Sequence, residues 1–183
     1  MRLLPREVPH RRPVVSKQQA FKKGDWIVHA FYGVGQIRAV ETKKLGDQST
    51  RYFKVDGRNS TFFVPVNNVE SARIRPLASR QKLRKALKIL KEPAEEFEGD
   101  HNARKRQIAE RVAVFSPEAT AELVRDLAGR RAAHGLNDHE ERAFEQAAFR
   151  LTREWAITED LDFEEAQQKL EAALDELYAK PAK

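Results

Sequence analysis

The chain has 183 residues, a net charge of +6 and no cysteine. Its length allows one large domain or two small ones, and the lack of cysteine excludes disulfides and thiolate metal sites and favours an intracellular compartment. No apolar run approaches the roughly 20 residues that cross a bilayer. We therefore expect a soluble, cytoplasmic protein without a membrane partner.

The charge is unevenly distributed along the chain. Residues 80–91 contain six Lys and Arg side chains and no acid, whereas residues 136–180 contain five Lys and Arg against 13 Asp and Glu. This asymmetry favours one surface that meets a polyanion and another that is kept away from it.

Residues 1–20 contain three prolines and scattered arginines, without a hydrophobic period. This pattern predicts a basic, disordered tail. A non-specific nucleic-acid arm is the alternative interpretation of the same residues.

The next segment, residues 21–76, has the pattern of a small β-domain. Gly and Asx residues typical of tight turns separate short runs of β-branched and aromatic residues. We expect strands over 26–31, 34–40, 51–55, 61–66 and 73–75, with turns at 32–33, 45–47 and 56–59. Four or five strands joined by hairpins predict a twisted sheet that closes into an SH3- or Tudor-like barrel.

After Pro76 the pattern is helical, which makes the fold class α+β: the barrel, then an all-α domain of about five helices over residues 77–183. Ser79 is expected to cap the first helix, Ser116 a later one, and Gly135 to end that later helix. Asn137 or Asp138 opens the next, in which Trp155 belongs to the apolar stripe.

Residues 99–106 (Gly-Asp-His-Asn-Ala-Arg-Lys-Arg) open the helix between these. Asp100 is a candidate N-cap, and the helix is expected to bury Ile108 and Val112. The cap would place cationic side chains beside free amides on the first turns, an arrangement suited to binding phosphates: His101, Arg104, Lys105 and Arg106. A solvated basic helix end is the competing interpretation.

No chemistry of an enzyme is recognisable. The five histidines show no metal-ligand spacing, and the chain has no P-loop, dinucleotide fingerprint or nucleophile elbow. We expect a protein that is not an enzyme, with no catalytic residues, no metal and no cofactor.

Several motifs resemble the CarD/CdnL family of bacterial transcription regulators, whose barrel also forms the RNA-polymerase-interacting domain of transcription-repair coupling factors. In the β-domain the resemblance lies in residues 24–29 (Gly-Asp-Trp-Ile-Val-His), 32–37 (Tyr-Gly-Val-Gly-Gln-Ile) and 63–68 (Phe-Val-Pro-Val-Asn-Asn). In the helical half it lies in Val-Arg-Asp-Leu at 124–127 and Glu-Glu-Arg at 140–142. It covers about residues 21–180 and leaves out the tail.

The resemblance implies two partners for a monomer. By this resemblance, the barrel is expected to dock on the polymerase β subunit by pairing an exposed strand with its sheet. The helical domain is expected to contact promoter DNA at the upstream edge of the bubble and to stabilise the open complex. The implied polymerase-facing residues are Lys43, Thr61, Phe62 and Phe63, although alternation turns one of the two phenylalanines toward the core.

The DNA-facing residues implied by the resemblance are His101 and Arg104, with Lys105 and Arg106 binding phosphate and Lys82, Arg84 and Lys85 adding to them if they face the same side. Relatives carry a Trp at the position of His101, which wedges into the minor groove. Some relatives also carry an Arg at the position of Phe63. We expect DNA contact with weaker wedging here, because imidazole has a smaller stacking face than indole.

Two other functions stay open from the residues alone. A stand-alone nucleic-acid-binding protein would bind naked duplex tightly, with a steep dependence on salt. A protein-interaction adaptor would use its acidic helices to recruit a basic partner, and DNA would be irrelevant to it.

Overall fold

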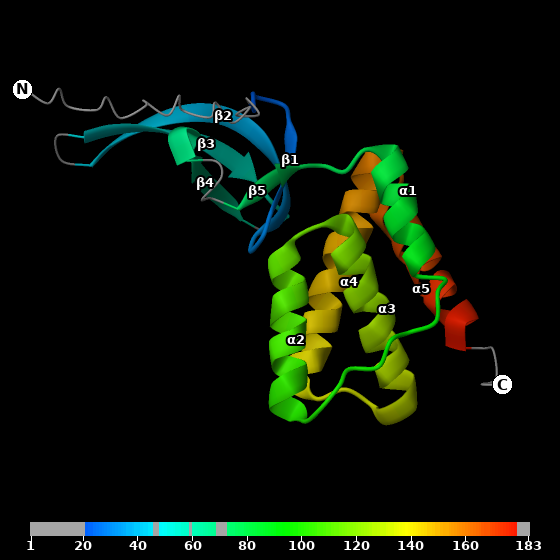
Figure 1. Ribbon diagram of the computed structural model, residues 1–183. Helices are drawn as coiled ribbons and strands as arrows, with labels where there is room; N and C mark the ends of the chain where they lie inside the picture. The colour runs from blue at the N-terminus through cyan, green and yellow to red at the C-terminus, as the bar shows by residue number, and fades with distance from the viewer. Residues whose placement is uncertain (1–20, 46–47, 59, 69–72, 179–183) are drawn as a thin grey trace, which may run out of the picture.

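The computed structural model describes residues 21–45, 48–58, 60–68 and 73–178. A β-domain precedes a helical domain along the chain, which confirms the expected α+β class (Figure 1). The tail 1–20 and most of the turn expected at 45–47 lie outside the described residues.

The described residues of the β-domain form one antiparallel sheet of five strands. They are β1 (Trp26–His29), β2 (Gly33–Leu45), β3 (Gln48–Asp56), β4 (Thr61–Pro65) and β5 (Ile74–Pro76), and a 3₁₀ turn, η1 (Val66–Asn68), follows β4. The strand order β4-β3-β2-β1-β5 makes β4 and β5 the edges of the described sheet.

All five strands contribute to one hydrophobic core. Its members are Ile27, Ile37, Phe53, Val55, Phe62 and Val64, with Ile74 and Phe21 packed against them. Because residues from both edge strands share this core, the sheet curls around it as a barrel-like domain does.

Strand β2 is longer than the expected segment 34–40. Its extension pairs with β3 at Thr42↔Arg51 and Lys43↔Thr50, and the two strands project beyond the rest of the sheet (Figure 1). Residues 41–44 are polar because this ribbon is largely exposed to water, so they lack the apolar alternation that marks a half-buried strand.

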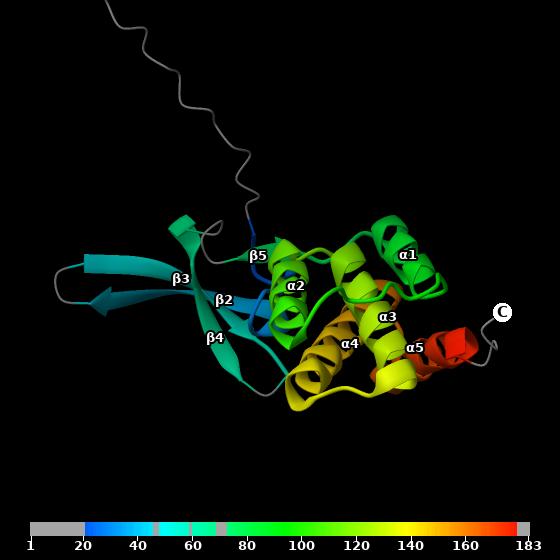
Figure 2. The ribbon, with the colours of Figure 1, turned by 60° about the horizontal axis from the view of Figure 1, so that its bottom comes forward.

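The helical domain has five helices over its described residues, 77–178, in agreement with the expected number. They are α1 (Arg80–Ile89), α2 (His101–Val114), α3 (Pro117–His134), α4 (Asp138–Glu159) and α5 (Phe163–Tyr178). Helix α3 packs against α1, α2 and α4, and α5 packs on α4, while α2 lies on the opposite side of the bundle from α1 (Figures 1 and 2). No helix in the described ranges is long and apolar enough to cross a membrane.

The expected caps are confirmed. Ser79, Asp100 and Ser116 each accept a hydrogen bond from the amide three residues on, and Gly135 follows the last residue of α3 with φ +75°. Asn137 caps α4 in a reciprocal capping box with Glu140.

The prediction that Val112 is buried is wrong. Helix α2 lies at the border of the bundle, buries only Ile108 fully, and leaves Val112 40 % exposed. Trp155 is half-buried and packs against the helical core.

Candidate functional site

Two residues predicted to face the polymerase, Lys43 on β2 and Phe63 on β4, lie together on the outer face of the sheet. The Lys43 Nζ atom lies 3.0 Å from the centroid of the Phe63 ring and 6.0 Å from that of Tyr52. Phe63 keeps 37 % of its surface exposed. A cation held over an exposed ring at an edge strand offers a partner both charge and apolar area.

Phe62 points the other way. It is 6 % exposed, and its ring stacks on that of Tyr32 with 4.7 Å between centroids. The alternation of β4 therefore divides the pair as expected, so Phe62 offers a partner its backbone rather than its side chain.

The hydroxyl of Thr61 donates to Asp56 Oδ1 at 3.1 Å, and Arg38 pairs with the other oxygen of Asp56 at 3.0 Å. These contacts hold the start of β4 in register with β3. We call Thr61–Pro65 with Lys43 the docking edge, after the role that the sequence resemblance predicts for these residues; β4 is an edge strand of the described sheet.

The β1–β2 turn beside Phe62 is held by a neutral histidine. His29 Nδ1 accepts hydrogen bonds from the amides of Phe31 at 3.0 Å and Tyr32 at 3.3 Å. Burial, followed by the charges of Arg150 and Arg73, lowers the pKa of His29 below its ordinary value. An imidazole that accepts at Nδ1 must carry its proton on Nε2.

At the far end of the molecule, the sequence Gly99–Arg106 forms the entry to α2, which we call the α2 tip. Gly99 has φ +80°, and a Cβ atom there would lie 2.9 Å from Ala103 Cβ. The next residue, Asp100, accepts a hydrogen bond from the Ala103 amide at 2.9 Å. That bond makes the largest contribution to a lowered pKa of Asp100, and the charges of the nearby arginines contribute less. The cap is therefore an anion at neutral pH.

The tip presents His101, Lys105 and Arg106 to solvent, but it turns Arg104 inward. Arg104 Nε lies 3.0 Å from Glu140 Oε1, and its Nη1 donates to the Gly99 carbonyl at 3.2 Å. Only 17 % of the Arg104 side chain is exposed. Three of the four tip residues predicted to face DNA are therefore available to a ligand, and the fourth is an internal anchor.

Glu140 joins the tip to the rest of the bundle. Its side chain is 2 % exposed, and Arg130 lies 3.1 Å from its second oxygen. Burial alone would raise the pKa of Glu140, but hydrogen bonds from Arg104, the Asn137 amide and Arg130 outweigh burial and lower it. The carboxylate thus stays charged between two arginines, one from α2 and one from α3.

The Val-Arg-Asp-Leu motif fixes the segment that leads to the tip. Asp126, which is 1 % exposed, accepts from the Glu95 amide at 2.8 Å and from Arg125 Nε at 2.6 Å, and it also pairs with Arg111 of α2. Both charged residues of the motif therefore act inside the protein. A charged pair between two core residues is the sequence signal for such a role.

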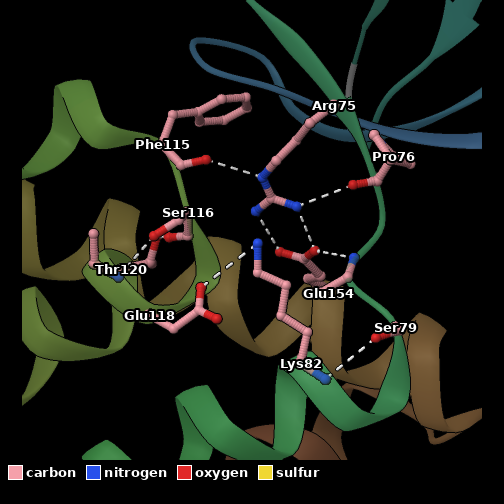
Figure 3. Close-up of polar contacts among 11 residues, drawn as sticks. Arg75, Pro76, Ser79, Lys82, Phe115, Ser116, Glu118, Thr120 and Glu154 are labelled. Carbon is pink, nitrogen blue, oxygen red and sulfur yellow. Dashed lines mark hydrogen bonds and ion pairs between the residues drawn. The ribbon is translucent and has the colours of Figure 1, made fainter. Parts of the chain in front are cut away.

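The cations of α1 are not brought to the tip. Lys82 Nζ lies 3.9 Å from Glu118 at the start of α3 (Figure 3), and Arg84 Nε lies 3.1 Å from Glu159 at the end of α4. Because Glu140 and Glu159 are separated by about 28 Å along α4 at the usual rise per residue, Lys82, Arg84 and the exposed Lys85 belong to the other end of the bundle.

Sequence reasoning missed a groove between α2, α4 and the β1–β2 turn. It has a volume of about 490 Å³, and Val112 and Phe31 line it together with three basic residues of α4: His139, Arg142 and Arg150. No hydrophobic period in the sequence predicts this groove, because it forms only where the β1–β2 turn meets α4, which is more than 100 residues later in the chain.

Comparison with known proteins matches both halves of the chain. Residues 21–78 match the model of the CarD-like/TRCF RID domain, and residues 85–171 match that of the CarD C-terminal domain. A relative in Bacillus subtilis (strain 168), named "Putative transcription factor YdeB", is 25 % identical over 129 residues, which cover 69 % of this chain and 84 % of the relative.

Proposed function

Because this chain belongs to the CarD/CdnL family of bacterial transcription regulators and has a transcription-related role that involves RNA polymerase, we propose that it docks on the polymerase β subunit through its docking edge. From there it holds the α2 tip against promoter DNA at the upstream edge of the bubble. The contact stabilises the open complex.

The observation that carries this proposal is the separation of two different surfaces on one molecule. The docking edge offers a strand edge with an exposed cation–aromatic pair, and the tip offers exposed cations at the N-terminus of a 14-residue helix. The C-terminus of α2 faces the β-domain, so its N-terminus points away from it (Figure 1). The protein would therefore link a partner bound at the docking edge to a partner bound at the α2 tip.

The tip suits a nucleic-acid backbone. His101, Lys105 and Arg106 are exposed, and the dipole of α2 adds partial positive charge at the same place. Arg104 has a different part in the proposal, since its ion pair with Glu140 fixes the geometry of the tip rather than contacting DNA. The cations of α1 are not required.

His101 has the position at which relatives carry a wedging Trp. It is exposed on the first turn of α2, where its ring would meet the DNA first. Base unstacking costs a few kcal/mol per step, and imidazole offsets less of that cost than indole. We therefore assign the tip mainly to phosphate contact, with limited wedging.

Docking is tested by binding of the full chain to core polymerase. Phe63→Ala removes the exposed ring over which the Lys43 ammonium lies. The affinity of the variant for core polymerase should therefore fall several-fold, as for a partly exposed aromatic contact worth roughly 1 kcal/mol. Phe31→Ala is the matched control, because Phe31 is a 75 % exposed phenylalanine of the same domain that lies in the β1–β2 turn and not on edge strand β4. Equal affinities of the two variants would contradict docking through this edge.

The other two functions give different results. A stand-alone DNA-binding protein would bind naked duplex tightly, with a slope of log affinity on log salt near −0.9 per phosphate neutralised; our proposal expects feeble binding to naked DNA. An adaptor would keep its full effect on transcription after Lys105→Ala and Arg106→Ala, whereas our proposal expects that effect to decrease.

A further inference from the structure

We propose that Arg75 and Glu154 are positioning residues, which lock the helical domain onto the β-domain and so set the distance between the docking edge and the α2 tip. The use of this distance in transcription rests on the proposed function. The lock itself does not, and it can be measured without polymerase or DNA.

Arg75, on edge strand β5, reaches across the domain boundary with every nitrogen of its guanidinium engaged (Figure 3). Nη1 and Nη2 form a bidentate pair with Glu154 of α4, at 2.6 and 2.8 Å. Nε donates to the Phe115 carbonyl at 3.0 Å, and Nη1 also donates to the Pro76 carbonyl at 3.1 Å. The planar fork of arginine suits this arrangement, and lysine could not reproduce it.

Glu154 completes the junction from the other side. Its side chain is 1 % exposed, and Oε1 also accepts from the Ala78 amide at 2.8 Å, in the segment that joins β5 to α1. One carboxylate therefore joins the last strand, the connecting segment and the C-terminal part of α4. Because desolvation offsets much of the attraction of a buried ion pair, we assign this pair mainly to the choice of a single arrangement of the two domains.

The same arginine holds the end of α2. Phe115 ends this helix in the left-handed conformation, with φ +55°, and its ring centroid lies 5.0 Å from the Arg75 guanidinium and 5.8 Å from that of Arg150. Arg73 adds a hydrogen bond to the Ala113 carbonyl at 3.1 Å. The C-terminus of α2 is thus fixed at the domain boundary.

Helix α2 then acts as a rigid strut. Its 14 residues span about 21 Å at the usual rise of an α-helix. The junction with Arg75 lies at one end, and the tip, anchored by Arg104 and Glu140, lies at the other. Any rotation of the helical domain on the β-domain would therefore displace His101 relative to the docking edge.

A spin-label distance measurement on the full chain tests the lock. The chain has no native cysteine, so Arg51→Cys on β3 and Glu110→Cys on α2, both exposed, provide two unique label sites. Glu154→Gln removes the charge and turns an amide donor toward Arg75. Its control is Glu165→Gln, which neutralises an exposed ion pair with Lys169 on α5.

The labelled protein should give one narrow distance distribution, unchanged in Glu165→Gln and clearly broadened or shifted in Glu154→Gln. Arg75→Lys, which keeps the charge, should give an intermediate result and guards against a folding defect of the first variant. Circular dichroism checks that each variant keeps its helix content. If Glu154→Gln and Arg75→Lys both keep their helix content and both give the narrow distance distribution of the native chain, the lock is overturned.

A second measurement compares the variants in polymerase binding and in open-complex lifetime. Glu154→Gln should still bind polymerase like the native chain but lose its extension of open-complex lifetime, and retention of that extension would overturn the role of the lock in setting the distance. If instead the native chain neither binds polymerase nor affects the open complex, the proposed function fails, while the distance measurement still decides on the lock.

Discussion

At the scale of single residues, the position of the α2 tip depends on carboxylates that are buried between arginines. Glu140 and Asp126 are 2 % and 1 % exposed, and each pairs with one arginine from α2 and one from α3. The interior thus holds its acids in networks, as buried charges require. The adjacent Glu141, by contrast, pairs with Arg131 at the surface.

Glu140→Gln should lower the free energy of unfolding by about 2–4 kcal/mol, because it leaves two arginines facing a neutral, misoriented amide. Glu141→Gln is the control, and loss of its exposed pair should cost less than about 1 kcal/mol. Urea unfolding followed by circular dichroism measures both. Similar losses in the two variants would show that Glu140 is not the anchor we describe.

His29 makes stability depend on pH. Its pKa in the folded protein lies below the unfolded value of 6.5, so the unfolded chain binds a proton more readily. Stability should therefore be fully present above pH 6.5 and fall as the pH drops through 6.5, until the folded histidine is also protonated. Thermal unfolding between pH 7.5 and 5.5 should show this loss in the native chain and much less of it in His29→Gln, whereas parallel profiles would contradict it.

Residue-scale prediction from the sequence succeeded where the relevant atoms are close along the chain. The Asp100 cap depends on an amide three residues away, so local chemistry sufficed to predict it. The inward turn of Arg104 depends on Glu140, 36 residues later, and no local pattern reports that distance. The sequence resemblance predicted a DNA contact for Arg104 and gave no sign of its ion pair with Glu140.

At the scale of elements, the segment between α1 and α2 is held by close packing as well as by charge. Ala94 lies against Gly129 of α3, where an added Cβ atom would come within 2.3 Å of the Ala94 Cβ. The Glu95 amide beside it is bonded to Asp126. This segment leads directly into the α2 tip.

Gly129→Ala should push this segment off α3, and Ala94→Gly should make room for the added methyl group. We expect a favourable coupling of roughly 1–2 kcal/mol between the two substitutions in a double-mutant cycle. Urea unfolding of the single and double variants measures it. Strict additivity would show that the two residues do not compete for the same space.

Element prediction was best for helices with local start and stop signals, such as Ser116 and Gly135 around α3. It was weaker where tertiary position decides. The exposed part of β2 has no apolar alternation to reveal it, and Val112 has a helical spacing but lies at the border of a groove rather than in the core.

At the scale of the whole molecule, the docking edge and the α2 tip, to which we assign the two proposed partners, lie on different domains, and Arg75 and Glu154 pair across the boundary between them. Both surfaces stay predictions from the sequence, and their relative placement could not be predicted from it, because Arg75 and Glu154 are 79 residues apart. The same limit applied to the α1 cations, which were expected to add to DNA binding if they faced the same side as the α2 tip, but which lie at the other end of the bundle.

The lifetime of the open complex on an unstable promoter tests the central claim most directly. The native chain should lengthen that lifetime, His101→Ala should shorten it relative to the native chain, and His101→Trp should lengthen it further, because indole wedges better than imidazole. No change with the native chain, or identical lifetimes for the native chain and both variants, would contradict a polymerase-docked contact between the α2 tip and promoter DNA.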